Sequence, residues 1–282
     1  MPKWRAIARD EEAGLRLALL GEAIEDSLYP AMLSAGLEAV KIKGECLPVR
    51  VRASEFVECV HHLVEAGFRG ASVADPNKVP AARLSERFYE AKHSLGVADT
   101  LSFDGGIFGM NTQVPGFIGP LSNVKPGTAL VLGARAVGRA VAMSLLLAGW
   151  EVRVWNQGAM KSRAIANAVR GTGQVKLIPD ADPARCSLIV NATRLGRRVG
   201  EQPPVIWQNS MRGAIAYDVV FRRVKTEFLR SAANRGLRTI DGREMLAEQA
   251  ALSLEWWTGR RVPREPLRRA VGLRGIPSTS DC

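Results

Sequence analysis

The sequence predicts an α/β protein that is built from two domains. Short apolar strands alternate with amphipathic helices along most of the chain. Near the middle, the polar and turn-rich segment PLSNVKPG at 120–127 interrupts this alternation and is a plausible domain boundary. A chain of 282 residues is long enough for two domains of ordinary size. We therefore expect a first domain over residues 1–122 and a second over residues 123–242.

The first half is predicted to hold three strands, two helices and a hairpin. The helix at 54–67 is supported by Phe56, Val57, Val60, Leu63 and Val64, which recur at three- and four-residue spacing. Gly105 and Gly106 separate two short strands and indicate a hairpin turn. The expected strands are 15–21, 39–49, 69–75, 101–103 and 107–112, and the expected helices are 54–67 and 80–95.

The second half shows the sharper alternation. Its strands are unbroken apolar runs separated by helices, which indicates a parallel sheet covered on both faces. The expected strands are 128–133, 151–156, 186–193, 213–220 and 238–242, and the expected helices are 137–150, 160–171, 226–236 and 243–259.

Composition narrows the classes of function. Hydrophobic residues make up 46% and charged residues 24% of the chain, as in a globular protein with an ample core. No apolar run is long enough to span a bilayer, and the amino terminus does not resemble a secretory signal, so we expect a cytoplasmic protein that binds no membrane. The net charge of +11 suits acidic small molecules. We expect no nucleic-acid partner, because no binding motif or interleaved aromatic residues accompany the basic clusters.

The cysteines and histidines do not predict a metal site. The four cysteines are scattered along the chain without short pairings, which also argues against a disulfide framework. His61 and His62 are adjacent, so on a helix they point about 100° apart and cannot share a metal ion.

The segment VLGARAVGRAV at 131–141 resembles a dinucleotide-binding turn with one residue changed. An apolar strand runs into Gly133, and Gly138 follows as a helix begins, but the middle glycine of the G-x-G-x-x-G fingerprint is replaced by Arg135. The arginine side chain can swing aside and bind the phosphates through its guanidinium group. Alternatively, it pairs with a carboxylate and occludes the site. The pattern indicates a Rossmann-type second domain.

The order of motifs along the chain resembles that of the shikimate dehydrogenase family. The segments that carry this resemblance are DSLYP (26–30), GASVADPNK (70–78), GVADTL (96–101), GMNTQVPGF (109–117), GARAVGRA (133–140), IVNAT (189–193), DVVFRRVKT (218–226) and DGREMLAEQAA (241–251). Each motif is weak alone, but their order and spacing together are specific.

The resemblance implies an amino-terminal substrate domain, a Rossmann-type NADP domain and a carboxy-terminal helix that returns to the first domain. Residues 243–265 would then complete the first domain, and residues 266–282 would form a flexible basic tail. The implied activity is NAD(P)-dependent oxidation of a ring alcohol, as in the shikimate pathway of aromatic amino acid biosynthesis. The implied partner is a cyclic hydroxy acid, and the chain would be a monomer or a homodimer.

The family's substrate and catalytic positions are only partly kept. Lys78 falls on the proton-transferring lysine, whereas Gln113 stands where the family has the partner aspartate of that lysine. A glutamine can form hydrogen bonds but cannot take up a proton at neutral pH. The remaining implied substrate-binding positions are Ser27, Tyr29, Ser72, Asp99, Phe221 and Gln249.

The changed positions suggest an altered substrate. Tyr29 replaces a serine and Ala74 replaces a threonine, which redistributes volume and hydrogen-bond donors in the pocket. Asp99 stands in place of an asparagine and suits an amino analogue of the ring as a charge partner. Alternatively, Asp99 only caps a turn.

The cofactor positions also follow from the resemblance. NADP is favoured over NAD, because no acidic residue ends the strand 151–156 and Lys161 and Arg163 follow shortly after it. Met245 would lie near the nicotinamide, although a core position explains it equally well. Besides Lys161 and Met245, the implied cofactor-binding residues are Gly133, Ala134, Arg135, Val137, Gly138, Asn156, Gln157, Asn191 and Thr193.

Two hypotheses about function remain open at this point. The first is an NAD(P)-dependent oxidoreductase that acts on a shikimate-like ring alcohol. The second is a catalytically silent member of the family that binds a metabolite or a partner protein without turnover.

Overall fold

The computed structural model describes residues 4–10, 12–89, 95–157, 165, 167, 169, 172–222 and 224–273. The chain divides into two compact units. Unit 1 comprises Met1–Thr112 and Leu246–Cys282, and unit 2 comprises Gln113–Met245. The sequence placed this boundary ten residues later, in the turn-rich segment, but residues 113–121 form a helix and a short 3-10 helix that cluster with unit 2.

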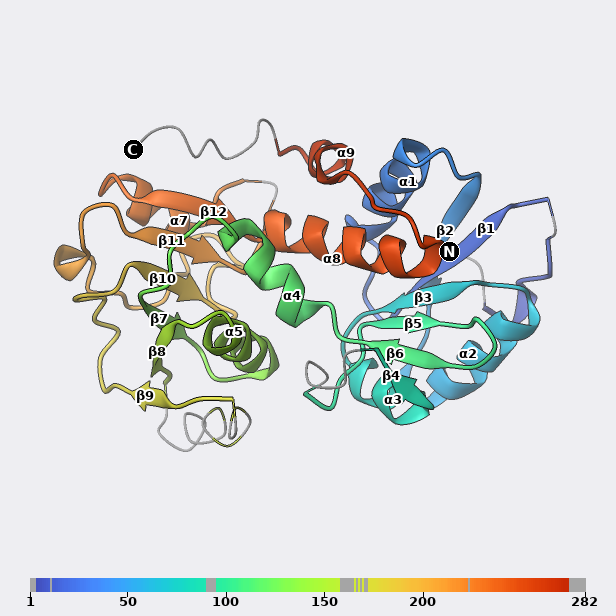
Figure 1. Cartoon of the computed structure of the whole chain (residues 1–282), viewed down its shortest axis with the longest axis horizontal. Coiled ribbons are helices and arrows are strands. Elements are labelled where there is room, and N and C mark those ends of the chain that lie inside the picture. Colours follow the sequence, from blue (N-terminus) through green and yellow to red (C-terminus); the bar gives the residue numbers. More distant parts are fainter. Residues whose placement is uncertain are drawn as a thin grey trace. The chain divides into compact units, whose positions relative to one another are not determined.

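Unit 1 is built on a mixed sheet of six strands in the order β2-β1-β3-β5-β6-β4 (Figure 1). β1 pairs in parallel with β2 and with β3, whereas β5 is antiparallel to both β3 and β6. The predicted hairpin around Gly105 is thus confirmed. The strands are β1 (Leu15–Gly21), β2 (Gly44–Arg50), β3 (Gly70–Val73), β4 (Arg87–Phe88), β5 (Thr100–Ser102) and β6 (Phe108–Met110).

Helices cover both faces of this sheet, because successive side chains of β1 point to opposite faces. Leu17 and Leu19 pack with α1, α8 and α9, while Ala18 and Leu20 pack with α2. The helices of the unit are η1 (Trp4–Ala6), α1 (Tyr29–Ala39), η2 (Ala53–Glu55), α2 (Phe56–Glu65), α3 (Lys78–Leu84), α8 (Gly242–Thr258, with its first four residues in unit 2) and α9 (Arg264–Ala270).

Three sequence expectations for unit 1 were wrong in detail. The helix expected at 80–95 spans only Lys78–Leu84, and Ser85 leaves it in an extended conformation so that Arg87–Phe88 can pair with β6. The strand expected at 39–49 starts only at Gly44, because helix α1 continues to Ala39. Residues 266–270, placed by the sequence in a tail, belong to helix α9, whose Leu267 is fully buried.

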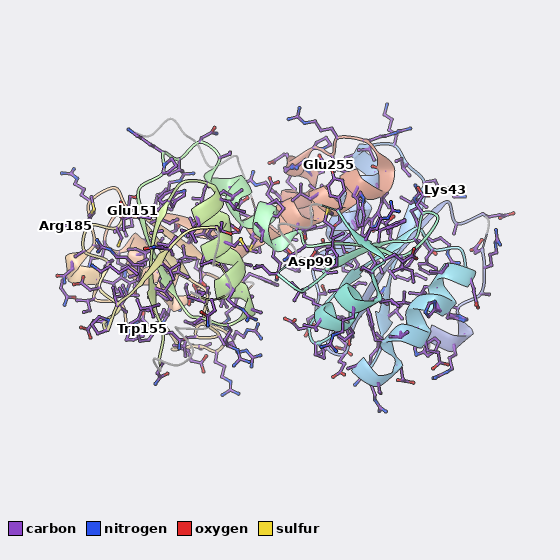
Figure 2. The ribbon with its side chains drawn as sticks, turned by 60° about the horizontal axis from the view of Figure 1, so that its bottom comes forward. Lys43, Asp99, Glu151, Trp155, Arg185 and Glu255 are labelled. Atoms are coloured by element: carbon purple, nitrogen blue, oxygen red, sulfur yellow. The ribbon has the colours of Figure 1, made fainter. Side chains whose placement is uncertain are left out.

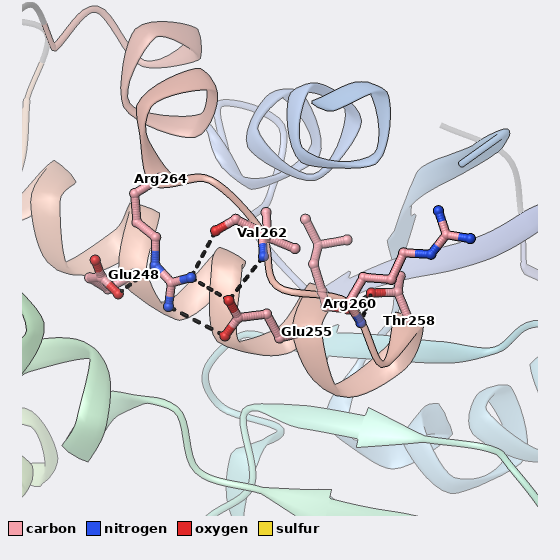
Figure 3. Close-up of polar contacts among 7 residues, drawn as sticks. Glu248, Glu255, Thr258, Arg260, Val262 and Arg264 are labelled. Atoms are coloured by element: carbon pink, nitrogen blue, oxygen red, sulfur yellow. Dashed lines mark hydrogen bonds and ion pairs between the residues drawn. The ribbon is translucent and has the colours of Figure 1, made fainter. Parts of the chain in front are cut away.

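The corner between α8 and α9 is held by Arg264 (Figure 3). Its guanidinium donates to Glu248 at 3.1 Å, to both carboxylate oxygens of Glu255 and to the Val262 carbonyl oxygen at 2.8 Å. The Glu255 carboxylate also accepts from the Val262 amide at 3.0 Å. These bonds fix the turn that returns α9 onto α1.

Unit 2 contains a fully parallel sheet in the order β12-β11-β10-β7-β8-β9. This is the strand order of the Rossmann fold, read from one edge of the sheet to the other, so the predicted fold class is confirmed. From β7 the strands follow in chain order toward one edge of the sheet (β8, β9), and from β10 they follow toward the other edge (β11, β12). The strand order therefore reverses between β7 and β10. The strands are β7 (Thr128–Leu132), β8 (Glu151–Trp155), β9 (Val175–Leu177), β10 (Leu188–Asn191), β11 (Ile215–Asp218) and β12 (Arg238–Asp241).

Helices pack on this sheet as well. Leu130, Ile189 and Ala216 lie in one cluster with Phe228 of α7, while Tyr217 stacks on Phe117 of α4 with ring centroids 4.7 Å apart. The helices are α4 (Gln113–Ile118), η4 (Gly119–Leu121), α5 (Ala136–Leu147), η5 (Trp207–Asn209) and α7 (Glu227–Ala233). Most of the helix predicted at 160–171 lies outside the described residues.

Candidate functional site

A buried carboxylate is the centre of a polar cluster in unit 1. Asp99, labelled in Figure 2, directly precedes β5 and is 5% exposed. Its Oδ1 atom accepts three hydrogen bonds: from the Thr112 amide at 2.8 Å, the Thr112 hydroxyl at 2.9 Å and the Thr100 hydroxyl at 3.2 Å. Its Oδ2 atom is equally buried, yet it has no hydrogen-bond partner among the described residues. Asp99 therefore does not simply cap a local turn, and one of its oxygens is left to accept another donor.

A chain of hydroxyl groups runs from Asp99 to Tyr29. The Thr100 hydroxyl lies 2.8 Å from that of Ser253, which lies 3.2 Å from the Tyr29 hydroxyl. Ser253 also contacts the carbonyl oxygen of Gln249 at 3.0 Å. The fold of unit 1 thus brings two sequence-predicted side chains, Tyr29 and Asp99, into one network, whereas Gln249 contributes only its backbone carbonyl oxygen, within helix α8. The sequence analysis did not predict Thr100 and Ser253, because neither stands at a position that the family resemblance assigns to the substrate or the cofactor.

Lys78 is the cation of this cluster. It opens helix α3, and its carbonyl oxygen accepts from the Ala98 amide at 2.9 Å, which places it beside the segment that carries Asp99. Burial raises the pKa of the Asp99 carboxyl, while the charge of Lys78 and the donors of Thr112 oppose this rise. Burial likewise raises the pKa of the Tyr29 phenol. The charge of the half-buried Lys78 therefore acts on the buried Asp99 carboxyl within unit 1.

Two further buried side chains next to this cluster lack partners. Asn77 precedes Lys78 and is fully buried, but neither its amide nitrogen nor its amide oxygen forms a hydrogen bond with a described residue. The Ser72 hydroxyl lies near the Tyr29 hydroxyl, but forms no hydrogen bond of normal length within the described part of the chain. Buried polar groups are usually satisfied, so each of these atoms, like Asp99 Oδ2, has capacity for a hydrogen bond to a polar ligand. Asn77 was not predicted, since the matched motif there assigns a role only to Lys78.

The remaining positions predicted for substrate, catalysis and the nicotinamide differ in exposure. The Ser27 hydroxyl accepts from the Tyr29 amide at 3.2 Å, which positions the start of α1. Gln113 and Met245 are buried at 7% and 4% exposure, whereas Phe221 is 39% exposed. These last three residues belong to unit 2.

The predicted glycine turn of unit 2 joins β7 to α5. Gly133 has φ of +106°, and a Cβ atom there would lie 2.8 Å from the Ala192 carbonyl oxygen. A Cβ at Gly138 would lie 2.3 Å from the Gly133 carbonyl oxygen. Only glycine fits at these two positions. The Gly133 amide donates to the Trp155 carbonyl oxygen at 2.8 Å, which ties the turn to the end of β8.

This turn fits the pyrophosphate of a dinucleotide. The backbone bends tightly against β10, and the first amides of the twelve-residue helix α5 point toward the same end. Ala134 in the turn is buried and Val137 is half-buried. Arg135 is exposed, and its side chain has no ion pair or hydrogen bond with any described residue. The described residues thus provide no carboxylate that would hold Arg135 across the site.

The loop after β10 is shaped by its own side chains. Asn191 is fully buried and donates to the Leu195 carbonyl oxygen at 3.0 Å and to Asp218 at 2.9 Å. Its Oδ1 atom accepts from the Thr193 amide and hydroxyl, and the same hydroxyl accepts from the Leu195 amide at 3.0 Å. Asn191 and Thr193 therefore position this loop through internal hydrogen bonds.

At the end of β8 the described residues include no acidic side chain that could bind a ribose hydroxyl. Asn156 is half-buried and donates to the Gln157 carbonyl oxygen at 3.1 Å, and Gln157 is exposed. Lys161 and Arg163, predicted to bind a 2′-phosphate, lie outside the described residues.

Among the described residues, no group of three or more histidine, cysteine, aspartate and glutamate side chains is placed to hold a metal ion. None of the described helices is both long and apolar enough to cross a membrane.

The fold and the site define a class: two-domain α/β proteins whose second unit is a Rossmann-type domain with a glycine turn at the strand reversal. Two family models match this chain, the shikimate dehydrogenase substrate binding domain over residues 19–101 and the shikimate 5′-dehydrogenase C-terminal domain over residues 242–271. The NADP(+)-dependent shikimate dehydrogenase of one Thermus thermophilus strain is 35% identical over 92% of this chain and 100% of its own length. The chain belongs to the shikimate dehydrogenase family, as the motifs predicted.

Solved structures agree with this assignment. Shikimate 5-dehydrogenase from another strain of Thermus thermophilus, in complex with NADP(H) and shikimate, superposes with a TM-score of 0.82 at 33% identity, covering 91% of this chain and 98% of that one. Quinate dehydrogenase from Corynebacterium glutamicum in complex with NAD has a TM-score of 0.81 at 25% identity, covering 91% and 98%. 5-Ketofructose reductase of Gluconobacter has a TM-score of 0.85 at 23% identity, covering 92% and 98%, and this likeness concerns the fold alone.

Proposed function

We propose that this protein is an NADP(H)-dependent oxidoreductase that interconverts a secondary alcohol and a ketone on a cyclic polyhydroxy acid of the shikimate or quinate type. The observation that carries the proposal is the buried carboxyl of Asp99, whose Oδ2 atom has no partner among the described residues and which the charge of the half-buried Lys78 influences, in the unit that matches the family's substrate domain. The names of the relatives support the substrate class and the choice of NADP.

Lys78 is the group that exchanges the proton in this proposal. When bound, NADP supplies the acceptor for the hydride that leaves the carbinol carbon. In the direction of oxidation, the Lys78 ammonium group first releases a proton to solvent and its amine then takes up the hydroxyl proton; in the reverse reaction the ammonium group returns a proton to the ketone oxygen. Gln113 contributes a hydrogen bond and no proton. Ser27 and Gln249 hold the ring.

The neighbourhood of Asp99 favours a hydroxyl group over an amine on the substrate. An ammonium group bound at Asp99 Oδ2 would lie close to the Lys78 cation, and two like charges in a partly buried site repel each other strongly. A neutral hydroxyl can donate to Asp99 Oδ2 without this repulsion. We therefore infer that the preferred substrate carries a hydroxyl group beside the alcohol that reacts.

The change from the family's aspartate to Gln113 supports a substrate preference that differs from that of shikimate dehydrogenases. It also favours the alternative function, in which the protein binds a ring hydroxy acid or a partner protein without turnover. The two functions predict different results in one assay.

The test is reduction of NADP, followed by the absorbance of NADPH, with shikimate, quinate and an amino analogue of shikimate. We expect turnover with at least one hydroxy acid, a weaker response to the amino analogue and a fall in kcat of about 10²- to 10⁴-fold in Lys78→Met. The matched control is Lys43→Met, which removes a lysine of unit 1 that lies outside the polar cluster. Binding of a hydroxy acid without turnover would establish the alternative function, and binding of neither substrate nor dinucleotide would exclude the proposal.

A further inference from the structure

Two exposed arginines, Arg135 and Arg194, lie just after strands β7 and β10, the neighbours between which the strand order of the unit 2 sheet reverses. β7 and β10 are parallel neighbours in a register that pairs Leu132 with Asn191. Arg135 and Arg194 each lie three residues beyond this pair. Both are exposed, and neither side chain has an ion pair or hydrogen bond to any described residue. Ligands of open α/β sheets bind outside the carboxyl ends of the strands at this reversal.

Contacts of the backbone bring the two turns together. The Cα of Gly133 faces the backbone of the next loop, because a Cβ there would lie 2.8 Å from the Ala192 carbonyl oxygen and 3.1 Å from the Thr193 amide nitrogen. The loop that carries Arg194 is held on both sides of it, since the Leu195 amide donates to the Thr193 hydroxyl at 3.0 Å. Arg194 therefore projects from a fixed loop beside the glycine turn that precedes Arg135.

The charge of this edge is not neutralised by the described residues. Asp218, a carboxyl group bonded to the base of this loop, is fully buried and takes its hydrogen bonds from Asn191, Thr226 and the Val220 amide. Two guanidinium groups that share one edge repel each other, and an anion bound between them relieves the repulsion. The amino terminus of α5 adds a favourable potential for the same anion.

We propose that Arg135 and Arg194 form a clamp for the pyrophosphate of the dinucleotide, and that their charge replaces the close backbone approach that a second glycine would allow. This inference rests on the proposed function, because it concerns the cofactor of that reaction. Guanidinium groups bind phosphate oxygens through paired hydrogen bonds, which a lysine cannot reproduce.

The experiment measures the dissociation constants of NADPH and NADH by nicotinamide fluorescence, and that of inorganic pyrophosphate by calorimetry. The variants are Arg135→Ala, Arg194→Ala, the double variant and Arg135→Lys. Arg212→Ala serves as the matched control, because Arg212 is exposed in the turn before β11, at the opposite end of the same sheet. Unfolding midpoints of all variants check that the fold is kept.

We expect each alanine variant to raise the dissociation constants of NADPH and NADH by the same factor, about 10- to 100-fold, as for the loss of a hydrogen bond to a charged group. Arg135→Lys should fall between wild type and Arg135→Ala, and Arg212→Ala should match wild type. Raising the salt concentration should weaken binding to wild type more than to the double variant.

The outcomes separate this inference from the proposed function. Tight dinucleotide binding that is unchanged in the double variant overturns the clamp and leaves the oxidoreductase standing. An effect on NADPH alone also overturns it, because the arginines would then bind the 2′-phosphate. Pyrophosphate binding that depends on both arginines, in a protein that binds neither dinucleotide, overturns the dinucleotide clamp together with the proposed cofactor and leaves the arginines as a site for a free anion. Failure to bind dinucleotide and pyrophosphate overturns both.

Discussion

Replacing Gly138 by alanine should change the free energy of unfolding in two opposite ways, through helix propensity and through a steric clash. Gly138 lies in the first turn of α5, where alanine should stabilise the helix by about 1 kcal/mol. However, the new methyl group would lie 2.3 Å from the Gly133 carbonyl oxygen and 2.9 Å from its carbonyl carbon. Real Cβ atoms essentially never approach closer than 3.0 Å, so this oxygen would have to retreat by about 0.7 Å.

The oxygen has little room to retreat. The Gly133 amide is bonded to the Trp155 carbonyl oxygen at 2.8 Å, and the Cα of Gly133 faces the Ala192 backbone. Forcing an extra methyl group into such a contact costs about 1–3 kcal/mol, and because the oxygen is held in place the cost here should lie in the upper half of that range, about 2–3 kcal/mol. After the gain of about 1 kcal/mol in helix propensity, we expect Gly138→Ala to lower the free energy of unfolding by about 1–2 kcal/mol. Because the displaced turn is the proposed pyrophosphate site, NADPH should also bind more weakly.

Urea unfolding followed by fluorescence and NADPH titration measure the two effects. Gly149→Ala is the control, because Gly149 has φ of +82° but a Cβ there would meet nothing within 4 Å. It should lose about 1 kcal/mol through backbone strain alone and bind NADPH normally. If Gly138→Ala is as stable as wild type or more so, helix propensity outweighs the contact and the tight packing of this turn is refuted.

Two further predictions concern stability. Burial raises the pKa of Asp218 to about 7, so the folded state keeps a proton that the unfolded chain releases near pH 4. The stability that this group contributes should therefore be greatest below about pH 4 and decline as the pH rises to about 7. In Asp218→Asn, the decline of the unfolding free energy with pH should be shallower. An unchanged profile would contradict the assignment. Arg264→Ala should lose about 1–3 kcal/mol, because it leaves the partly buried Glu255 unpaired. Arg269→Ala, which removes a 67% exposed partner 3.5 Å from Glu265, should change the melting temperature little, and equal losses in the two variants would refute the role of the α8–α9 corner.

Much of the fold could be predicted because its signals are local. The strand at 15–21 agrees residue for residue with β1, and the strand that enters Gly133 and the helix that follows it lie where the pattern placed them. Residues 17–20 are all buried and pack alternately into the two clusters, as expected of a strand between two helical layers. The helix expected at 80–95 was wrong over residues 85–89, because pairing of Arg87–Phe88 with β6 outweighed local helix propensity.

The sequence by itself determined the family, the two α/β domains, the glycine turn and the position of Lys78, since each of these depends on residue types at fixed spacing. Only the tertiary structure decided that Asp99 keeps one buried oxygen without a partner among the described residues. Only it decided, too, that Arg135 and Arg194 follow paired residues of neighbouring strands at the same distance along the chain. The physical reason is that hydrogen-bond satisfaction and strand register join residues that are far apart in the chain. Neither leaves a periodic pattern along it.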